Sequence, residues 1–197
     1  MPEDPQPYRR KLLRLPDYDY SSEGGYFVTI VTHKRIPFFG TIIENSVLLS
    51  DRGQIARDEW FHTGQLRDNV ELFKDEFVVM PNHIHGIIWL NDKLPVGVEQ
   101  KIYICGEVQP VVVGVERRST PTRINFPKVV PGSIPAIIRA YKSAVTYAIN
   151  LLQHTPGQPV WQRNYYEHII RDEKDYENMI EYIYMNPHNW EKDEEYH

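Results

Sequence analysis

Two histidines in the middle of the chain have a spacing that can hold a metal ion. His83 and His85 flank Ile84 in a long apolar run, residues 77–90, that is typical of a buried strand. Because successive side chains of a strand point to opposite faces, the two imidazoles share one face. Two neutral imidazoles on a rigid strand can bind one divalent cation. An isolated His-x-His pair is more often an ordinary strand-end feature, so the pair alone does not decide between these interpretations.

A second pair of chemical groups lies near the C-terminus, where residues 171–187 have the pattern of a helix. Asp172 suits the N-cap, acidic residues fill the first turn, and Pro187 marks the end. Tyr182 and Asn186 are four residues apart on this helix, so a phenol and a carboxamide extend side by side. A phenol can serve as a nucleophile once it is activated.

These segments, together with several others, resemble a known family of DNA-processing enzymes. They are similar to the HUH-type single-tyrosine transposases of small insertion sequences, and especially to the branch of REP-associated tyrosine transposases. The resemblance covers most of the chain and implies an RRM-like, ferredoxin-like α+β core. The matching segments are residues 15–20, 25–30, 79–88, 138–145 and 160–187.

The resemblance also implies a mechanism and the residues that perform it. Tyr182 is then the nucleophile that attacks a phosphodiester of single-stranded or hairpin DNA and forms a 5′-phosphotyrosine. His83 and His85 are then ligands of a divalent metal, Mg²⁺ or Mn²⁺. Asn186 takes the place of an amide ligand that is usually a glutamine in the insertion-sequence branch, and its side chain is one carbon shorter.

Other residues compete for these roles. The chain has 13 tyrosines, and most tyrosines in proteins are core or surface residues, so Tyr182 stands out through its spacing to Asn186 and through the family pattern. His168 is a further candidate ligand or orienting residue. The competing nucleophiles are Tyr184, Tyr165, Tyr166, Tyr141 and Tyr147.

The charge of the chain disfavours indiscriminate binding to nucleic acid. The net charge is −5, whereas phosphate contacts usually come from an excess of Lys and Arg. Basic residues are nevertheless segregated, which allows a locally basic groove on an acidic protein. The residues expected to contact DNA are Arg9, Arg10, Lys11, Arg14, Arg139, Lys142 and Arg163.

Periodicity along the chain predicts an α+β fold, an antiparallel sheet with helices packed on one face. One strand is expected at 26–31, a hairpin at 38–49, a short strand at 70–73, one bent extended segment over 77–90, and a last extended segment over 160–170. The helices are expected at 51–62, with Asp51 and Gln54 as a capping box, at about 133–149, and at 172–186.

The organisation of the chain is expected to be simple. Residues 1–24 form a polar arm, 25–190 one domain with a loop insertion at about 91–132, and 191–197 an acidic tail. No apolar stretch is long enough to span a bilayer, no signal-peptide pattern is present, and Cys105 is the only cysteine. These features predict a cytoplasmic protein that associates with the nucleoid when it is on DNA.

The sequence therefore favours a metal-dependent single-strand DNA endonuclease and strand transferase acting on hairpin-forming DNA. Two alternatives remain: a catalytically silent, hairpin-binding regulatory protein, and a small metal-dependent phosphoesterase of another fold. A monomer and a homodimer are both compatible, because the tyrosine helix of one subunit completes the partner's site in the insertion-sequence branch, whereas REP-associated relatives can be self-contained.

Overall fold

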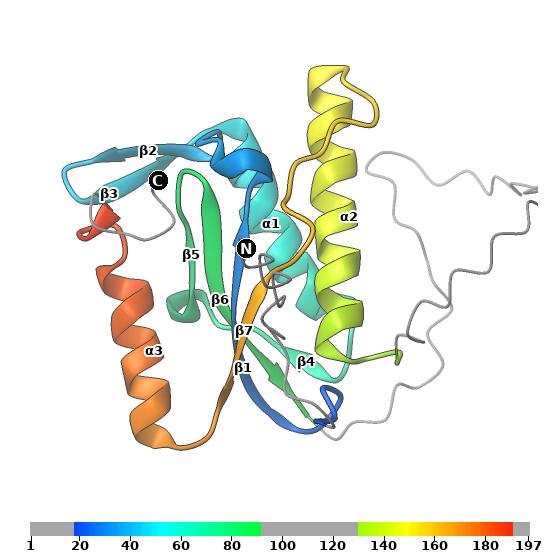
Figure 1. Cartoon of the computed structure of the whole chain (residues 1–197), viewed down its shortest axis with the longest axis vertical. Helices are drawn as coiled ribbons and strands as arrows, with labels where there is room; N and C mark the ends of the chain where they lie inside the picture. Colours follow the sequence, from blue (N-terminus) through cyan, green and yellow to red (C-terminus); the bar gives the residue numbers. More distant parts are fainter. Residues whose placement is uncertain (1–17, 92–129, 191–197) are drawn as a thin grey trace, which may run out of the picture.

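The computed structural model describes residues 18–91 and 130–190, and Figure 1 shows their arrangement. The expected α+β class with an antiparallel sheet is confirmed. The described residues include the predicted arm from residue 18 onward and the two ends of the predicted insertion. The predicted tail, 191–197, lies outside them. The elements are β1 (Gly24–Val31), η1 (His33–Arg35), β2 (Gly40–Ile43), β3 (Ser46–Leu49), α1 (Asp51–Gln65), β4 (Val70–Glu71), η2 (Lys74–Glu76), β5 (Phe77–Val79), β6 (His83–Leu90), α2 (Ile134–Gln153), β7 (Tyr166–Ile170) and α3 (Glu173–Met185).

The main sheet is built around β1, which pairs antiparallel with β6 on one side and β7 on the other. Both β4 and β5 pair with β6. The prediction of one bent segment over 77–90 is wrong: the chain reverses between β5 and β6, and Val79 lies opposite Ile84. Pro81 stands in this reversal, where its missing N–H costs the ladder no hydrogen bond.

The two faces of β1 contact different helices. Tyr26, Val28 and Ile30 belong to a large core with α1 and α2, whereas Phe27 packs on the other face with Ile183 of α3. The helices were predicted on one face, but in Figure 1 α3 lies across the sheet from α1 and α2. The reason is that β1 is apolar on both sides, so each of its faces needs a cover.

The start of α1 also differs from its prediction. Ser50, rather than Asp51, is the N-cap, because its side-chain oxygen accepts a hydrogen bond from the Gly53 amide at 3.2 Å. Position 53 requires glycine, since a Cβ there would lie 2.0 Å from the Phe39 carbonyl oxygen. For α3, in contrast, Asp172 is the N-cap as predicted and accepts from the Asp175 amide at 2.8 Å.

Close packing against α1 holds β6 in place. Trp60 of α1 stacks on Phe77 with ring centroids 4.7 Å apart, and Gly86 of β6 lies beneath this pair. A Cβ at Gly86 would approach the Trp60 ring to 2.5 Å, so the strand and the helix meet without a side chain between them. Tyr141 of α2 donates a hydrogen bond to the Ala56 carbonyl at 2.9 Å and fixes α2 on α1. The strand that carries the two histidines is therefore rigidly supported.

The other predicted strands are shorter than expected. The strand at 70–73 ends at Glu71, and the segment at 160–161 contributes one bridge between Trp161 and Thr32. β2 and β3 form a separate two-stranded sheet. Within residues 18–91 and 130–190, no helix has the length and apolar character needed to cross a bilayer.

Candidate active site

His83 and His85 lie next to each other on the face of β6 that is turned toward α3. Both are buried, and their ring centroids are 4.4 Å apart. His83 Nδ1 lies 2.7 Å from the side-chain oxygen of Asn82. Because a carbonyl oxygen can only accept, Nδ1 carries a hydrogen, and in the neutral imidazole the lone pair is then on Nε2. This is the tautomer that binds a cation through Nε2.

A threonine on the neighbouring strand orients His85 in the same way. The register of β1 and β6 places Thr29 directly opposite His85, and Thr29 Oγ1 lies 2.8 Å from His85 Nδ1. Burial, with a smaller contribution from His83, holds the pKa of His85 well below its usual range. The imidazole of His85 is therefore neutral at physiological pH, the form a metal ion needs.

The end of α3 brings Tyr182 and Asn186 to these histidines. The Tyr182 ring meets the His85 ring edge-on at 5.0 Å and the Phe27 ring at 5.9 Å, and 44% of its surface stays exposed. Asn186 is buried at the C-cap of the helix, with its Nδ2 3.3 Å from His85 Nε2. The four residues predicted to carry the chemistry thus meet at one place, although their roles stay predictions.

The donor set at this place fits a divalent cation. In the present orientation the Asn186 amide nitrogen donates to His85 Nε2, and a half-turn of the amide would present Oδ1 there instead. Two imidazole nitrogens and one amide oxygen suit Mn²⁺ and are compatible with Mg²⁺. Among the described residues no three His, Cys, Asp or Glu side chains form a metal-binding group. Three protein donors would leave an ion here with open positions for substrate or water.

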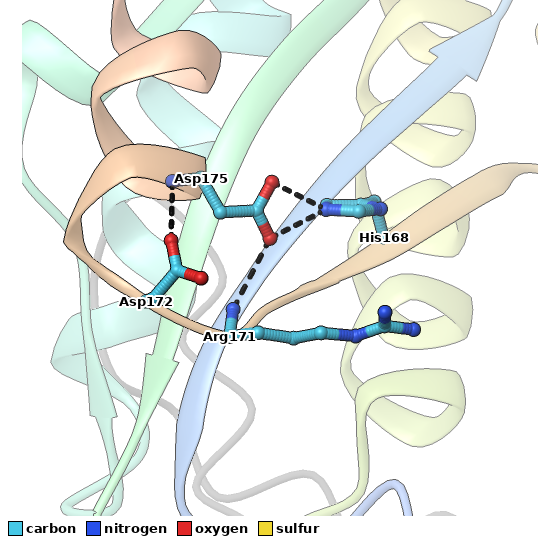
Figure 2. A network of polar contacts seen from close by, with 4 residues as sticks. All are labelled: His168, Arg171, Asp172 and Asp175. Atoms are coloured by element: carbon cyan, nitrogen blue, oxygen red, sulfur yellow. Dashed lines mark hydrogen bonds and ion pairs between the residues drawn. The ribbon is translucent and has the colours of Figure 1, made fainter.

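A network of polar contacts ties the start of α3 to β7, as Figure 2 shows. His168 Nε2 lies 2.9 Å and 2.8 Å from the two carboxylate oxygens of Asp175. The Arg171 amide donates to the same carboxylate at 3.1 Å. The His168 hydrogen bond lowers the pKa of Asp175. His168 was predicted as an extra ligand or orienting residue, but the structure places it in this helix-docking pair.

Three of the predicted DNA-binding residues gather elsewhere, at one groove. Arg139, Lys142 and Arg163 line a hollow of about 480 Å³ between α2 and residues 159–163. The Lys142 ammonium donates to the carbonyls of Gln162 at 2.6 Å and of Arg163 at 3.1 Å. Burial lowers the pKa of Lys142 to about 8. The other four, Arg9, Arg10, Lys11 and Arg14, lie outside the described residues.

Sequence reasoning missed the two residues that orient the imidazoles. Asn82 precedes His83 directly, but nothing in the sequence shows that its side chain turns back onto the ring. Thr29 is a hydroxyl in an otherwise apolar strand, and that was a usable signal. A partner for it could be named only with the β1–β6 register in hand.

Comparison with known proteins shows which proteins the chain is similar to. No family model matches it. An uncharacterized protein of Haemophilus influenzae is 37% identical over 190 residues, which are 96% of this chain and 94% of that protein. The REP-associated tyrosine transposase of Escherichia coli is 39% identical over 56 residues, which are 27% of this chain and 30% of that protein. The matched region thus spans less than a third of the Escherichia coli protein.

A solved structure agrees with this match. A REP-associated tyrosine transposase bound to a REP hairpin has a TM-score of 0.52 and 22% identity, with 90% of this chain and 76% of that one covered. The chain shares the fold of this REP-associated tyrosine transposase. An identity of 22% shows a shared fold alone, so the chemistry of the candidate site is inferred from this chain's own residues and their geometry.

The burial of His85 predicts how the stability of the protein without bound metal responds to pH. Below pH 6.5 the unfolded chain takes up a proton at position 85 and the folded protein does not, so stability falls as pH drops through 6.5. The contribution is up to about 1.4 kcal/mol per pH unit. Urea unfolding with a chelator at pH 7.5, 6.5 and 5.5 measures it.

His85→Gln is the control for this measurement, because it removes the titrating group. The free energy of unfolding of the wild type minus that of the variant should become smaller as the pH falls. Parallel stability curves for the two proteins would show that His85 is protonated in the folded state.

Proposed function

We propose that this chain is a metal-dependent endonuclease and strand transferase that acts on single-stranded, hairpin-forming DNA through a covalent 5′-phosphotyrosine. The observation that carries the proposal is the position of Tyr182, whose ring lies against His85 at the place where His83 and Asn186 also converge. A nucleophile, two imidazoles and an amide are the groups that such a reaction needs.

Tyr182 suits a macromolecular substrate because its ring is held on one edge and exposed on the other. Its oxygen attacks the phosphorus, the bond from phosphorus to the 3′-oxygen breaks, and the leaving strand takes a proton to become a 3′-OH. Attack by another 3′-OH reverses the step and transfers the strand. The tyrosyl ester conserves the energy of the phosphodiester, so no nucleotide cofactor is required.

A phenol has a pKa of about 10 and needs help to react at neutral pH. A divalent ion held by His83, His85 and the Asn186 oxygen would polarise the scissile phosphate and offset its developing charge. The remaining contributions come from the protein. Asn82 and Thr29 fix the direction of the imidazoles. Loss of such outer hydrogen bonds typically lowers metal affinity or activity by roughly 10-fold to 100-fold.

The groove at α2 supports DNA binding. Its lining holds three cationic side chains and no carboxylate, although the whole chain has a net charge of −5. Arg139 and Arg163 are exposed at its edge, and Tyr147 exposes 69% of its surface, which suits stacking on a base. Lys142 has a different part: its ammonium holds the backbone at Gln162 and Arg163 and so shapes the groove wall.

The choice of a hairpin substrate is supported by the solved relative, which is described as bound to a REP hairpin. The N-terminal cations Arg9, Arg10, Lys11 and Arg14 are proposed as further phosphate contacts. Incubation with a labelled hairpin and Mn²⁺ separates the alternatives. A covalent adduct supports the proposal, and retained but uncut DNA supports a silent binding protein. If there is no adduct and no retained DNA, a small phosphoesterase is favoured.

The first prediction concerns the nucleophile. Tyr182→Phe should abolish the covalent adduct and leave hairpin affinity within about threefold, because the variant loses the attacking oxygen and keeps the ring. Tyr184→Phe is the matched control on the same helix, and it should form adduct at the wild-type rate. Mass spectrometry of the adduct identifies the residue, and a phosphotyrosyl peptide carrying Tyr165, Tyr166 or Tyr184 would overturn the assignment.

The second prediction concerns the ion. His83→Ala and His85→Ala should each weaken Mn²⁺ binding by roughly tenfold or more, because each removes one of few protein ligands. Calorimetry with Mn²⁺ measures the affinity. His154→Asn is the control, since it removes an exposed imidazole and asparagine tolerates the left-handed backbone found there. Unchanged affinity in both alanine variants would leave the pair as ordinary strand histidines.

The third prediction concerns the groove. Replacing Arg139 and Arg163 together by alanine should weaken hairpin binding and reduce the slope of log K against log salt by about 1.4 to 1.8, at roughly 0.7 to 0.9 per phosphate contact. Arg57→Ala is the control, because its guanidinium pairs with Asp58 on α1. If the double variant kept the wild-type slope, the phosphate contacts would have to lie elsewhere, for example on the N-terminal cations.

A further inference from the structure

A buried carboxylate joins the two elements of the candidate site. Glu76, at the end of η2, exposes 5% of its surface. The Trp89 indole N–H donates to its Oε2 at 2.7 Å, and the Tyr176 hydroxyl donates to its Oε1 at 2.7 Å. Both oxygens therefore accept a short hydrogen bond, the arrangement in which such bonds are strong and directional.

The two donors come from the elements that carry the proposed chemistry. Trp89 lies on β6, four residues after His85 and on the same face of the strand. Tyr176 lies on α3, six residues before Tyr182. The Trp89 and Tyr176 rings also pack together, with centroids 5.7 Å apart. One side chain thus links the strand of the imidazoles to the helix of the phenol.

Apolar packing alone holds α3 weakly. Ile183 is its one fully buried residue, and the partly buried Tyr176, Met179 and Ile180 complete its contact with Phe27 and the rest of a small cluster. A helix of 13 residues depends on tertiary contacts for its stability. Directional polar contacts therefore have a large part in setting where this helix lies on the sheet.

We propose that Glu76 is a positioning residue: by holding Tyr176 and Trp89 together it sets the place of α3 on the sheet and so the distance from Tyr182 to the histidines. The proposal rests on the function proposed above. Glu76 does not touch the reacting atoms. Its hydrogen bond raises the pKa of Tyr176 to about 12, so this phenol stays a protonated donor and is not a competing nucleophile.

The test compares the full-length wild type with Glu76→Gln, Glu76→Ala and Tyr176→Phe. Glu177→Gln is the matched control, because it makes the same chemical change at an exposed position next to Tyr176. Three quantities are measured: the adduct rate at saturating concentrations of a labelled DNA hairpin with single-stranded flanks and Mn²⁺, the dissociation constant for that hairpin, and amide hydrogen exchange of α3 and β6.

A displacement of about 1 Å can cost on the order of 100-fold in rate, so we expect a loss of that size in Glu76→Ala with hairpin affinity within about threefold. Glu76→Gln should lie between the wild type and the alanine variant, since an amide keeps one acceptor. Exchange should accelerate in α3 and stay unchanged in β6. Glu177→Gln should match the wild type in all three measurements.

A wild-type adduct rate in Glu76→Ala would overturn the proposal, and so would equal acceleration of exchange in α3 and β6. If the alanine variant does not fold, Tyr176→Phe decides, because it keeps the carboxylate and one hydrogen bond and should still slow the adduct by about tenfold. If the wild type forms no adduct, the proposed function fails, and hydrogen exchange of α3 still reports whether Glu76 holds the helix.

Discussion

The register between β1 and β6 is the constraint on which the site depends. It pairs Thr29 with His85 and Val31 with His83, so both imidazoles lie on the buried strand β6, beside the buried strand β1. A slip by one residue would move every side chain of β6 to the opposite face. The histidines would then point into the core with α1 and α2, and Ile84 would face α3. Packing of Gly86 beneath Trp60 makes that slip costly, because a side chain at this point cannot be accommodated.

The two faces of the sheet serve different purposes. The face toward α1 and α2 carries the large core, with Trp60, Tyr141 and the isoleucines of α2 fully buried. The face toward α3 carries a small apolar cluster and two polar attachments, one from Asp175 to His168 and one from Tyr176 to Glu76. The layer with α1 and α2 thus supplies most of the buried apolar contacts, whereas the layer with α3 sets the geometry of the site. Changes on the α3 face can therefore alter the site while the sheet remains folded.

The sequence was informative where a short period in the residues reports directly on geometry. Alternation over two residues placed His83 and His85 on one face, and a spacing of four placed Tyr182 and Asn186 on one side of a helix. The Asp172 cap followed from local chemistry in the same way. All three depend on neighbours in the chain, and the structure contains each of them.

The parts that could not be predicted depend on residues distant in sequence. Nothing near Glu76 announces that its carboxylate accepts from a tyrosine 100 positions later. Lys142 was expected to contact DNA phosphate. A lysine on a helix gives no sign in the sequence that loop carbonyls will surround its ammonium. The placement of α3 across the sheet from the other helices likewise follows from β1 being apolar on both faces. Such features need the tertiary fold, whose pairings local patterns do not specify.

The orientation of the Asn186 amide has a consequence for how the site would compete for metal. In the structure its nitrogen donates to His85 Nε2, so an ion bound as proposed would have to displace that hydrogen bond. A net hydrogen bond of about 0.5 to 1.5 kcal/mol corresponds to a reduction in affinity of roughly 2-fold to 10-fold. The same bond gives His85 Nε2 a partner without an ion. The orientation of one amide would thus set part of the affinity of the proposed metal site.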